Sequence, residues 1–148
     1  MSNSTDAYDD QNIFARILRG ELPCHKIYED DDTLAFMDVM PRSTGHCLVI
    51  PKQASRNLLD ISSHDLGKLM AVVQRVMRAA QKALSADGIT IQQFNEVAAG
   101  QEVFHTHIHI LPRFDGIKLD PPGNMANDMN VLAEQAKLIA SALESVSK

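Results

Sequence analysis

The sequence predicts an α+β domain built on a mainly antiparallel sheet of about five strands, with one long helix and short terminal helices. Three observations support this fold class. Short apolar runs bounded by Gly, Pro or acidic residues follow one another through short links, as strands of an antiparallel sheet do. One long amphipathic stretch, 62–84, separates two groups of these runs. Shorter apolar helical patterns lie near the two ends, at 13–18 and 131–143.

The first half of the chain predicts one helix and three strands. An apolar pattern at helical spacing runs from Ile13 to Leu18 and stops at Gly20, which predicts a short helix. The acidic run 29–32 predicts a hairpin turn rather than a metal site, because charge runs are usually solvated. Around it, extended segments are expected at 25–28, 33–37 and 47–50, with a loop at 41–45.

The second half predicts the long helix, two more strands and a last helix. Ser62 or Ser63 can cap the long helix, with Asp65 in its first turn. Strands are expected at 89–94 and 103–111, and loops at 95–100 and 115–130. One apolar stripe of the long helix is expected to pack on the sheet, and it consists of Leu66, Leu69, Met70, Val73, Met77, Ala80 and Leu84.

Length and composition limit the kinds of protein that this chain can be. The chain has 148 residues and a net charge of −5, which fits one folded domain and argues against a nucleic-acid-binding surface. We expect a flexible polar tail at 1–11 and a single domain at 12–148. Two cysteines do not make a disulfide framework, and the chain shows neither a signal-peptide pattern nor a long apolar span. These features predict a cytoplasmic protein that binds no nucleic acid polymer and no membrane.

Three of the six histidines occupy alternate positions in one apolar run. Alternate side chains of a strand share one face, so His105, His107 and His109 are expected to line one side of the predicted strand. The residues between them would then pack against the core. A strand face that is simply exposed to solvent more often carries Lys, Thr or Glu, so the histidines favour a chemical role.

Two chemistries compete for this histidine face. A metal site is disfavoured, because the first and last of three alternate residues lie about 13 Å apart at the backbone and zinc takes its ligands at about 2.1 Å. No Cys-x-x-Cys or His-Glu-x-x-His pattern supplies further ligands. A neutral imidazole can instead attack phosphorus at pH 7 while its neighbours orient it and protonate a leaving group. Small residues at 98–100 let backbone amides approach an anion, so we favour phosphoryl chemistry.

Two blocks of the sequence resemble one known family. The run GQEVFHTHIHILPR at 100–113 resembles the histidine triad (HIT) signature His-φ-His-φ-His-φ-φ, in which φ is apolar. A second block resembles the N-terminal half of the same family and covers 13–23, 28–30, 36–38 and 45–52. The resemblance spans roughly residues 12–115. It is strongest to the nucleoside phosphoramidase (histidine triad nucleotide-binding) branch and its bacterial relatives.

The resemblance implies a HIT-like fold, a homodimer, binding of purine nucleotides and cleavage at the α-phosphate without a cofactor. It implies that His107 is the nucleophile and that His105, His109 and His46 are its catalytic neighbours. Asp38 would bind the ribose hydroxyls, since a carboxylate suits two donors. The base and sugar pocket would consist of Ile13, Phe14, Ile17, Phe36, Val39 and Leu48. Contacts to the phosphate and a further sugar contact would come from Gly100, Gln101, Glu102, Val103 and Asn95.

Several positions depart from the family pattern. Asn12 and Ala15 stand where many bacterial relatives carry a zinc-binding Cys pair, so no metal is expected. Glu102 stands where some members have Ser or Thr, and an ionised carboxylate cannot donate to phosphate. It is expected to turn away or to select against a second anionic group. The loop 95–99 lacks a glycine that is usual in the family. His109 stands where nucleotidyl-transferring relatives have Gln, which points to hydrolysis.

The sequence therefore predicts an enzyme, a HIT-family nucleotide hydrolase. The leading hypothesis is cleavage of purine nucleoside phosphoramidates or related nucleotidyl conjugates through a nucleotidyl-histidine on His107, with release of AMP or GMP. One alternative keeps the hydrolase but changes the substrate to dinucleoside polyphosphates. Another is a non-catalytic nucleotide-sensing interaction module. The sequence leaves these three open.

Overall fold

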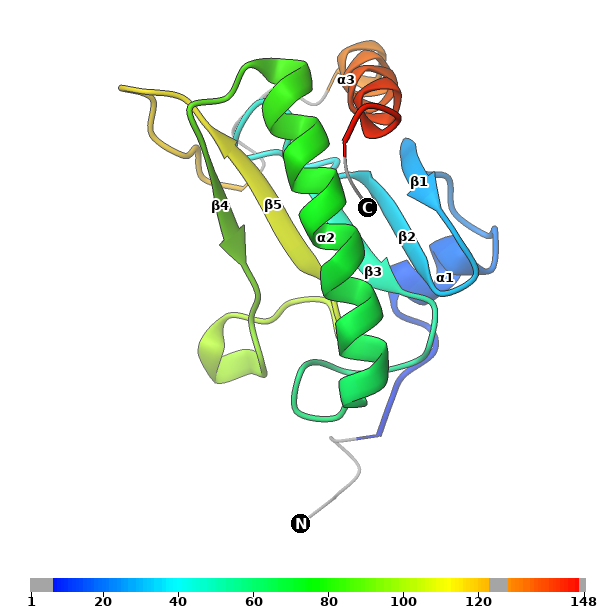
Figure 1. The fold of residues 1–148 in the computed structure, drawn as a ribbon. Coiled ribbons are helices and arrows are strands. Elements are labelled where there is room, and N and C mark those ends of the chain that lie inside the picture. Colours follow the sequence, from blue (N-terminus) through cyan, green and yellow to red (C-terminus); the bar gives the residue numbers. More distant parts are fainter. Residues whose placement is uncertain (1–6, 123–127, 147–148) are drawn as a thin grey trace.

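Each strand of the sheet pairs with its neighbours antiparallel, in the order β1-β2-β3-β5-β4 (Figure 1). The computed structural model describes residues 7–122 and 128–146. Its strands are β1 Lys26–Glu29, β2 Thr33–Met37, β3 Cys47–Pro51, β4 Gly88–Gln92 and β5 Ile108–Arg113. Its helices are α1 Ile13–Leu18, α2 Ser63–Leu84 and α3 Met129–Leu143, with a 3₁₀ turn η2 at Val97–Ala99. The predicted α+β class with five strands is confirmed.

The long helix α2 is defined by a capped start and one apolar stripe. The Ser62 side chain accepts a hydrogen bond from the backbone N–H of Asp65 at 3.0 Å, so Ser62 is the cap. The helix ends at Ser85, which adopts a left-handed conformation with φ of 52°. Met70 was wrongly assigned to the buried stripe, since it is 40% exposed. It follows the buried Leu69 and is therefore turned by about 100° around the helix axis, toward solvent.

The strands β2 and β3 are buried on both faces of the sheet, and their alternate residues divide between the two faces. In β2, Ala35 and Met37 pack in the cluster beneath α2 and α3, whereas Leu34 and Phe36 pack in a second cluster with α1. In Figure 1, α2 crosses in front of the sheet. The cluster on the α1 side is smaller, and the candidate site lies on that side of the sheet.

The strand β5 begins at Ile108, five residues later than predicted. Its pairing with β3 starts only at this residue. Upstream, the backbone N–H of Thr106 donates to the carbonyl of Ser55 at 2.9 Å, and the two side-chain hydroxyls lie 2.7 Å apart. These bonds hold the chain against the loop after β3, so the prediction that His105 and His107 lie in a strand is wrong.

Other boundaries also differ from the prediction. The strand β4 ends at Gln92, two residues early, and η2 forms within the predicted loop 95–100. Part of the predicted tail is packed on the domain, since the Asn12 side-chain amide donates to the Tyr8 hydroxyl at 3.0 Å and to the Asp9 carbonyl at 2.8 Å. Residues 1–6 of that tail, and 123–127 of the predicted loop 115–130, lie outside the described residues.

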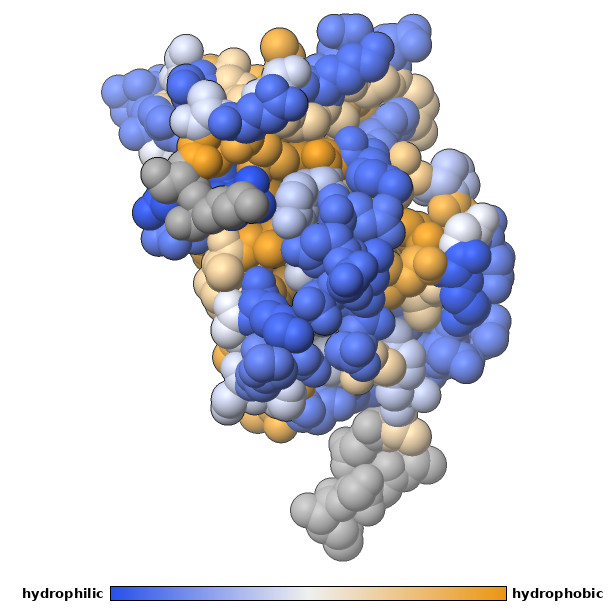
Figure 2. Space-filling view, turned by 45° about the vertical axis from the view of Figure 1, so that its right-hand side comes forward, coloured by the Kyte–Doolittle hydropathy of each residue, from blue (hydrophilic) through white to orange (hydrophobic). Residues whose placement is uncertain are grey.

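One face of the molecule is mainly polar. Hydrophilic residues cover most of the face shown in Figure 2, and apolar residues occupy smaller areas between them. Among the helices that the structure describes, none combines the length and the apolar composition of a membrane span.

Candidate active site

A cavity of about 510 Å³ opens on the α1 side of the sheet. Most of the predicted site residues line it, and these are Ile13, Phe14, Ile17, Phe36, Asp38, Val39, His46, Leu48, Gly100, Glu102, Val103, His107 and His109. Three predicted residues do not line it: Asn95, Gln101 and His105. Sequence reasoning missed several lining residues, among them Arg42, Gln92 and Phe94.

Five aromatic rings follow one another along this cavity. The ring centroids of Phe36 and Phe14 lie 5.6 Å apart, and those of Phe14 and His107 lie 4.9 Å apart. The succession continues from His107 to His109 at 5.1 Å and from His109 to Phe94 at 5.9 Å. All four pairs are edge-on, a favourable geometry for aromatic side chains. The two histidines therefore lie between a Phe pair at one end and Phe94 at the other.

His107 is held in one tautomer by the backbone. Its Nδ1 lies 2.6 Å from the carbonyl oxygen of His105, which can only accept, so Nδ1 carries the proton. The lone pair is then on Nε2. Burial lowers the pKa of His107, since only 8% of the residue is exposed. The result is a neutral imidazole on the cavity wall with one nitrogen free to act as a nucleophile.

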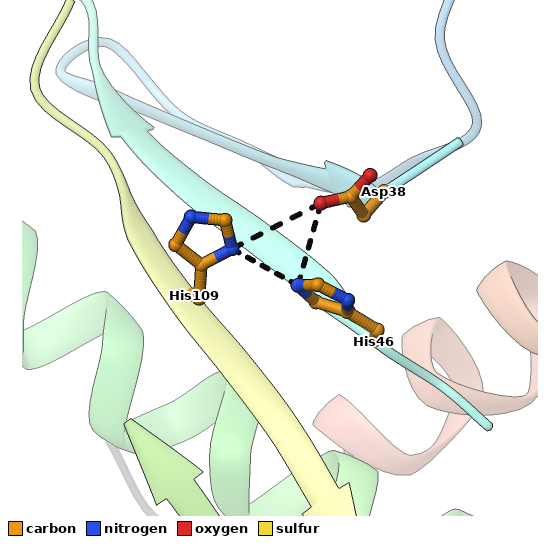
Figure 3. Close-up of side chains that lie close together, drawn as sticks. All are labelled: Asp38, His46 and His109. Atoms are coloured by element: carbon orange, nitrogen blue, oxygen red, sulfur yellow. Dashed lines mark hydrogen bonds and ion pairs between the residues drawn. The ribbon is translucent and has the colours of Figure 1, made fainter. Parts of the chain in front are cut away.

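A second chain of contacts fixes the protons of His46 and His109 (Figure 3). The backbone N–H of Arg42 donates to Nδ1 of His46 at 3.0 Å, so His46 carries its proton on Nε2. That Nε2 lies 3.0 Å from Nδ1 of His109 and 3.3 Å from Oδ2 of Asp38. Burial is the main cause that lowers the pKa of His46 to about 4 and of His109 to about 3, so both rings are neutral. His109 therefore accepts through Nδ1 and carries its own proton on Nε2.

The same three side chains have a spacing that a metal ion could use. Ligand atoms of Asp38, His46 and His109 all lie within 4.8 Å of one another. Coordination through Nε2 of His46 would move its proton to Nδ1, where the N–H of Arg42 already points. The donor set therefore fits a hydrogen-bonded relay and does not fit a divalent ion.

His105 is fully buried and lies behind the cavity wall. Its Nε2 lies 2.8 Å from the carbonyl of Pro51, which accepts, so Nε2 carries the proton. Its Nδ1 accepts from the Tyr8 hydroxyl at 2.5 Å. Both ring nitrogens are thus occupied, and burial lowers its pKa to about 4. His105 was expected to be a catalytic neighbour of His107, and it contacts that residue only through its backbone carbonyl, which orients the His107 ring.

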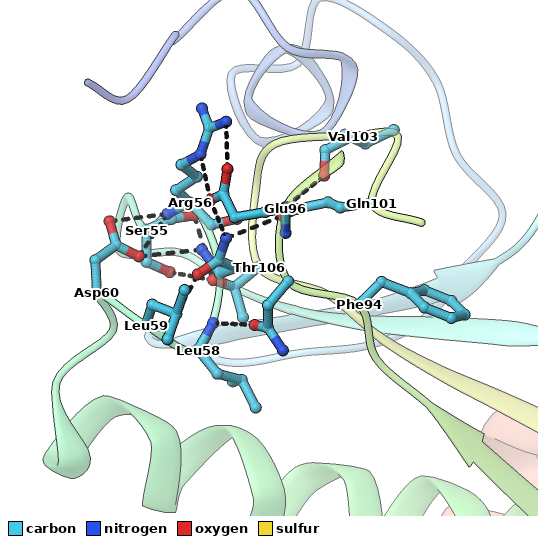
Figure 4. A network of polar contacts seen from close by, with 12 residues as sticks. Ser55, Arg56, Leu58, Leu59, Asp60, Phe94, Glu96, Gln101, Val103 and Thr106 are labelled. Carbon is cyan, nitrogen blue, oxygen red and sulfur yellow. Dashed lines mark hydrogen bonds and ion pairs between the residues drawn. The ribbon is translucent and has the colours of Figure 1, made fainter. Parts of the chain in front are cut away.

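Gln101 organises the loop beside the site and does not reach the cavity (Figure 4). Its Nε2 donates to the carbonyls of Arg56 and Val103, at 2.7 and 3.0 Å. Its Oε1 accepts from the side chain of Asn57 and the backbone N–H of Glu96. Every polar atom of this buried side chain is used, so the predicted phosphate contact of Gln101 is wrong.

Asn95 also belongs to this loop network. Its Oδ1 accepts from the backbone N–H of Leu58 at 2.9 Å and from the side chain of Gln93, also at 2.9 Å. Its Nδ2 donates back to Gln93 at 2.8 Å. The predicted sugar contact of Asn95 is therefore wrong, and the neighbours Gln92 and Phe94 line the cavity in its place.

Glu96 adopts a backbone conformation that is nearly confined to glycine, with φ of 78° and ψ of 161°. This conformation costs about 1–3 kcal/mol for a residue with a side chain. The carboxylate offsets the cost through Arg56, which donates to it twice, at 2.7 and 2.9 Å, and through Asn57 at 2.7 Å. The missing loop glycine is thereby explained: an ion pair holds the turn that glycine would adopt freely.

The model of the HIT domain family matches residues 19–116 of the chain. The chain belongs to the HIT domain family. This match includes β1 to β5, α2 and each histidine of the site.

Solved HIT structures share the whole architecture. A Hit-like protein involved in cell-cycle regulation from Bartonella henselae, solved with an unknown ligand, is 51% identical with a TM-score of 0.88, over 92% of this chain and 98% of that one. A hypothetical histidine triad nucleotide-binding protein from Sulfolobus tokodaii is 32% identical with a TM-score of 0.82, over 89% and 91% of the two chains. The predicted HIT-like fold is therefore confirmed.

One curated relative in the HIT family carries an enzyme name. The Arabidopsis thaliana protein Adenylylsulfatase HINT3 is 42% identical over 101 residues. The matched region is 68% of this chain and 51% of the plant protein, so the two share one domain and differ in length.

Tyr8 was missed by sequence reasoning because it falls in a polar segment with no pattern of its own. We predict that Tyr8→Phe in this HIT protein lowers kcat about fivefold and leaves KM within twofold. The lost hydroxyl contributes about 1 kcal/mol, and it orients His105 without lining the cavity. Steady-state kinetics on an adenosine 5′-phosphoramidate, a substrate of the class expected from the sequence, measures the effect.

Tyr28 provides the matched control, since its hydroxyl bonds to Asp30 in the turn between β1 and β2. Tyr28→Phe is expected to leave both constants unchanged. Equal kinetics for the two variants would show that the contact between Tyr8 and His105 has no positioning role.

Proposed function

We propose that this HIT protein is a nucleotide-binding hydrolase that cleaves purine nucleoside 5′-phosphoramidates or related nucleotidyl conjugates at the α-phosphate. The observation that carries the proposal is the tautomer of His107: its Nδ1–H is bound to a backbone carbonyl, and its free Nε2 belongs to a ring on the wall of the cavity. The nucleotide-binding name of the archaeal structure and the enzyme name of the plant relative support it.

In the first step, Nε2 of His107 forms a bond to the α-phosphorus and the bond from phosphorus to the leaving amine breaks. The amine leaves with the electron pair and needs one proton. An anionic phosphate beside His109 raises the pKa of that histidine, so its ring can bind a second proton when substrate is present. That proton binds at Nδ1, which then turns from His46 toward Oδ2 of Asp38, 3.9 Å away, and the Nε2–H of His109 is transferred to the amine. The product of this step is a nucleotidyl-histidine.

In the second step, water attacks the same phosphorus. His109 is now neutral with its lone pair on Nε2, so Nε2 accepts the proton of the water while the bond between phosphorus and Nε2 of His107 breaks. AMP or GMP is released, and both histidines return to their starting state. His46 holds the Nδ1 side of His109 while that ring is neutral, and Asp38 lies beside the same nitrogen when the ring is protonated.

The apolar end of the cavity suits a purine base. Phe14 and Phe36 supply aromatic edges there, and Ile13 and Val39 lie exposed at 48% and 45%. Asp38 uses one oxygen to accept from the N–H of Met40 at 2.8 Å, and each of its oxygens retains a lone pair for a ribose hydroxyl.

The test is rapid-quench mass spectrometry with a slowly hydrolysed phosphoramidate. We expect a transient mass increase of one nucleotidyl group that maps to His107. A protein that binds AMP without forming any adduct and without turnover would instead be the non-catalytic sensing module. Rates on a dinucleoside polyphosphate in parallel decide between the two hydrolase substrates.

We further propose that the protein is a homodimer joined through β4. This strand has a partner on only one side within the described residues, and it exposes 38% of Ile91. An open edge strand with an apolar residue is a typical pairing surface. Multi-angle light scattering is expected to give about twice the chain mass, and a monomer mass at all concentrations would contradict the dimer.

A further inference from the structure

The cavity has two chemically different ends. Phe36 and Phe14 mark the apolar end, and Phe94 marks the opposite end, where Gln92 also lines the wall. The reactive pair, His107 and His109, lies between them. If the base occupies the apolar end, the leaving group departs from His107 toward the end of the cavity that contains Phe94.

A short loop at 100–103 connects these two ends. A side chain added at Gly100 would lie 3.5 Å from the ring of Phe94, so the loop starts beside that ring. Val103 packs with the apolar cluster on the α1 side, so the loop finishes near Phe14. Glu102 lies between them and lines the cavity together with both histidines.

Among the residues that the structure describes, Glu102 is the charged group of the cavity without a hydrogen bond or an ion pair. Of the other charged lining residues, Asp38 is bound to the N–H of Met40 and lies beside His46, and Arg42 donates to the carbonyl of Asp120 at 2.7 Å. No hydrogen bond or ion pair joins Glu102 to any of the described residues, and its side chain is exposed. This carboxylate is therefore available to a ligand.

We propose that Glu102 makes the leaving-group end of the cavity select conjugates whose leaving group carries a positive charge, and reject sulfate and phosphate leaving groups. This inference rests on the proposed hydrolase function. The α-phosphate already brings one negative charge, and an ionised carboxylate accepts hydrogen bonds but cannot donate them. An ammonium group on the leaving amine, as in a diamine or a lysine side chain, satisfies the carboxylate, whereas a second anion is repelled.

The size of this preference follows from simple electrostatics. Unit charges about 6 Å apart in a partly solvated site change an equilibrium about tenfold, in favour of the attractive pair and against the repulsive one. We therefore expect a cationic leaving group to be preferred over an anionic one by about a hundredfold. Adenylyl sulfate, the conjugate to which the name of the plant relative refers, is expected to be a poor substrate here.

The experiment uses three adenosine 5′-phosphoramidates with alkylamine leaving groups of equal length that end in an ammonium, a methyl or a carboxylate group. Values of kcat/KM are compared for the wild type and Glu102→Gln. The ratio between the ammonium and carboxylate substrates is expected to fall from about a hundred to near one, while the methyl substrate changes less than threefold. Glu134→Gln, on the exposed side of α3, is the control.

A ratio that stays the same in Glu102→Gln would overturn the inference, and so would a wild type that prefers the carboxylate substrate. Absence of turnover on all three substrates would contradict the hydrolase function instead. In that case the dissociation constants of the same compounds, measured by calorimetry with and without the Glu102→Gln change in a His107→Asn background, still decide the role of Glu102. Equal affinities for the ammonium and carboxylate compounds would reject it.

Discussion

Replacing His107 by Asn is expected to reduce kcat at least a thousandfold on any adenosine 5′-phosphoramidate, while AMP affinity stays within about threefold. The amide of Asn can still donate to the carbonyl of His105, so the local backbone is retained. It has no basic nitrogen to attack phosphorus, and loss of a nucleophile costs on the order of 10³–10⁶ in kcat. Single-turnover kinetics and calorimetry with AMP measure the two effects separately.

His109→Asn and His64→Asn complete this experiment. His109 is proposed to transfer protons, so its replacement is expected to cost about a hundredfold. His64 is exposed on α2 and its replacement should have no effect. Full turnover in His107→Asn would contradict the covalent mechanism, even if nucleotide binding were unchanged.

Acid is expected to destabilise this fold by several kcal/mol between pH 7.5 and 5. Burial lowers the pKa of His46 and His105 to about 4 and that of His109 to about 3, against about 6.5 in an unfolded chain. As the pH falls through 6.5, the unfolded chain binds protons that the folded chain does not. The free energy of unfolding therefore decreases, by up to about 1.4 kcal/mol per histidine for each pH unit. The decrease levels off below about pH 4 for His46 and His105 and below about pH 3 for His109.

Urea unfolding followed by circular dichroism measures this slope. The window above pH 5 is chosen because ordinary carboxylates remain ionised there and add little. His105→Gln removes one buried titrating ring and should make the slope shallower, whereas His64→Gln should leave it unchanged. A free energy of unfolding that is constant from pH 7.5 to 5 would show that the buried rings are not held neutral by the fold.

The element order could be predicted from the sequence because apolar periodicity and capping are local signals. β2 was predicted with its observed bounds, 33–37, and the helix at 13–18 likewise. The start of β5 could not be predicted, because His105 and Thr106 continue the alternating pattern while long-range bonds to Pro51 and Ser55 remove them from the sheet. The apolar pattern of a segment shows which residues can be buried. It does not show whether the backbone bonds to a neighbouring strand or to a loop.

The cavity lining was largely predicted, but the roles of polar side chains were not. The triad and Asp38 were found because their types and spacing match a family pattern. Gln101 matches that pattern and Asn95 lies one position away from it, yet the amides of both bond to the loop network. Whether an amide faces a ligand or its own loop depends on partners some 40 residues away along the chain, such as Asn57 and Leu58.

The pairing of Arg56 with a strained Glu96 restricts the order in which these two positions can change during divergence or redesign. A change of Glu96 to glycine removes the strain and the ion pair together, so it is a passable first step. A change of Arg56 made first removes the ion pair, keeps only the hydrogen bond from Asn57, and leaves the strain in place. Substitution at residue 96 is therefore expected to precede substitution at residue 56. A library that varies residue 56 alone is expected to contain mainly destabilised variants.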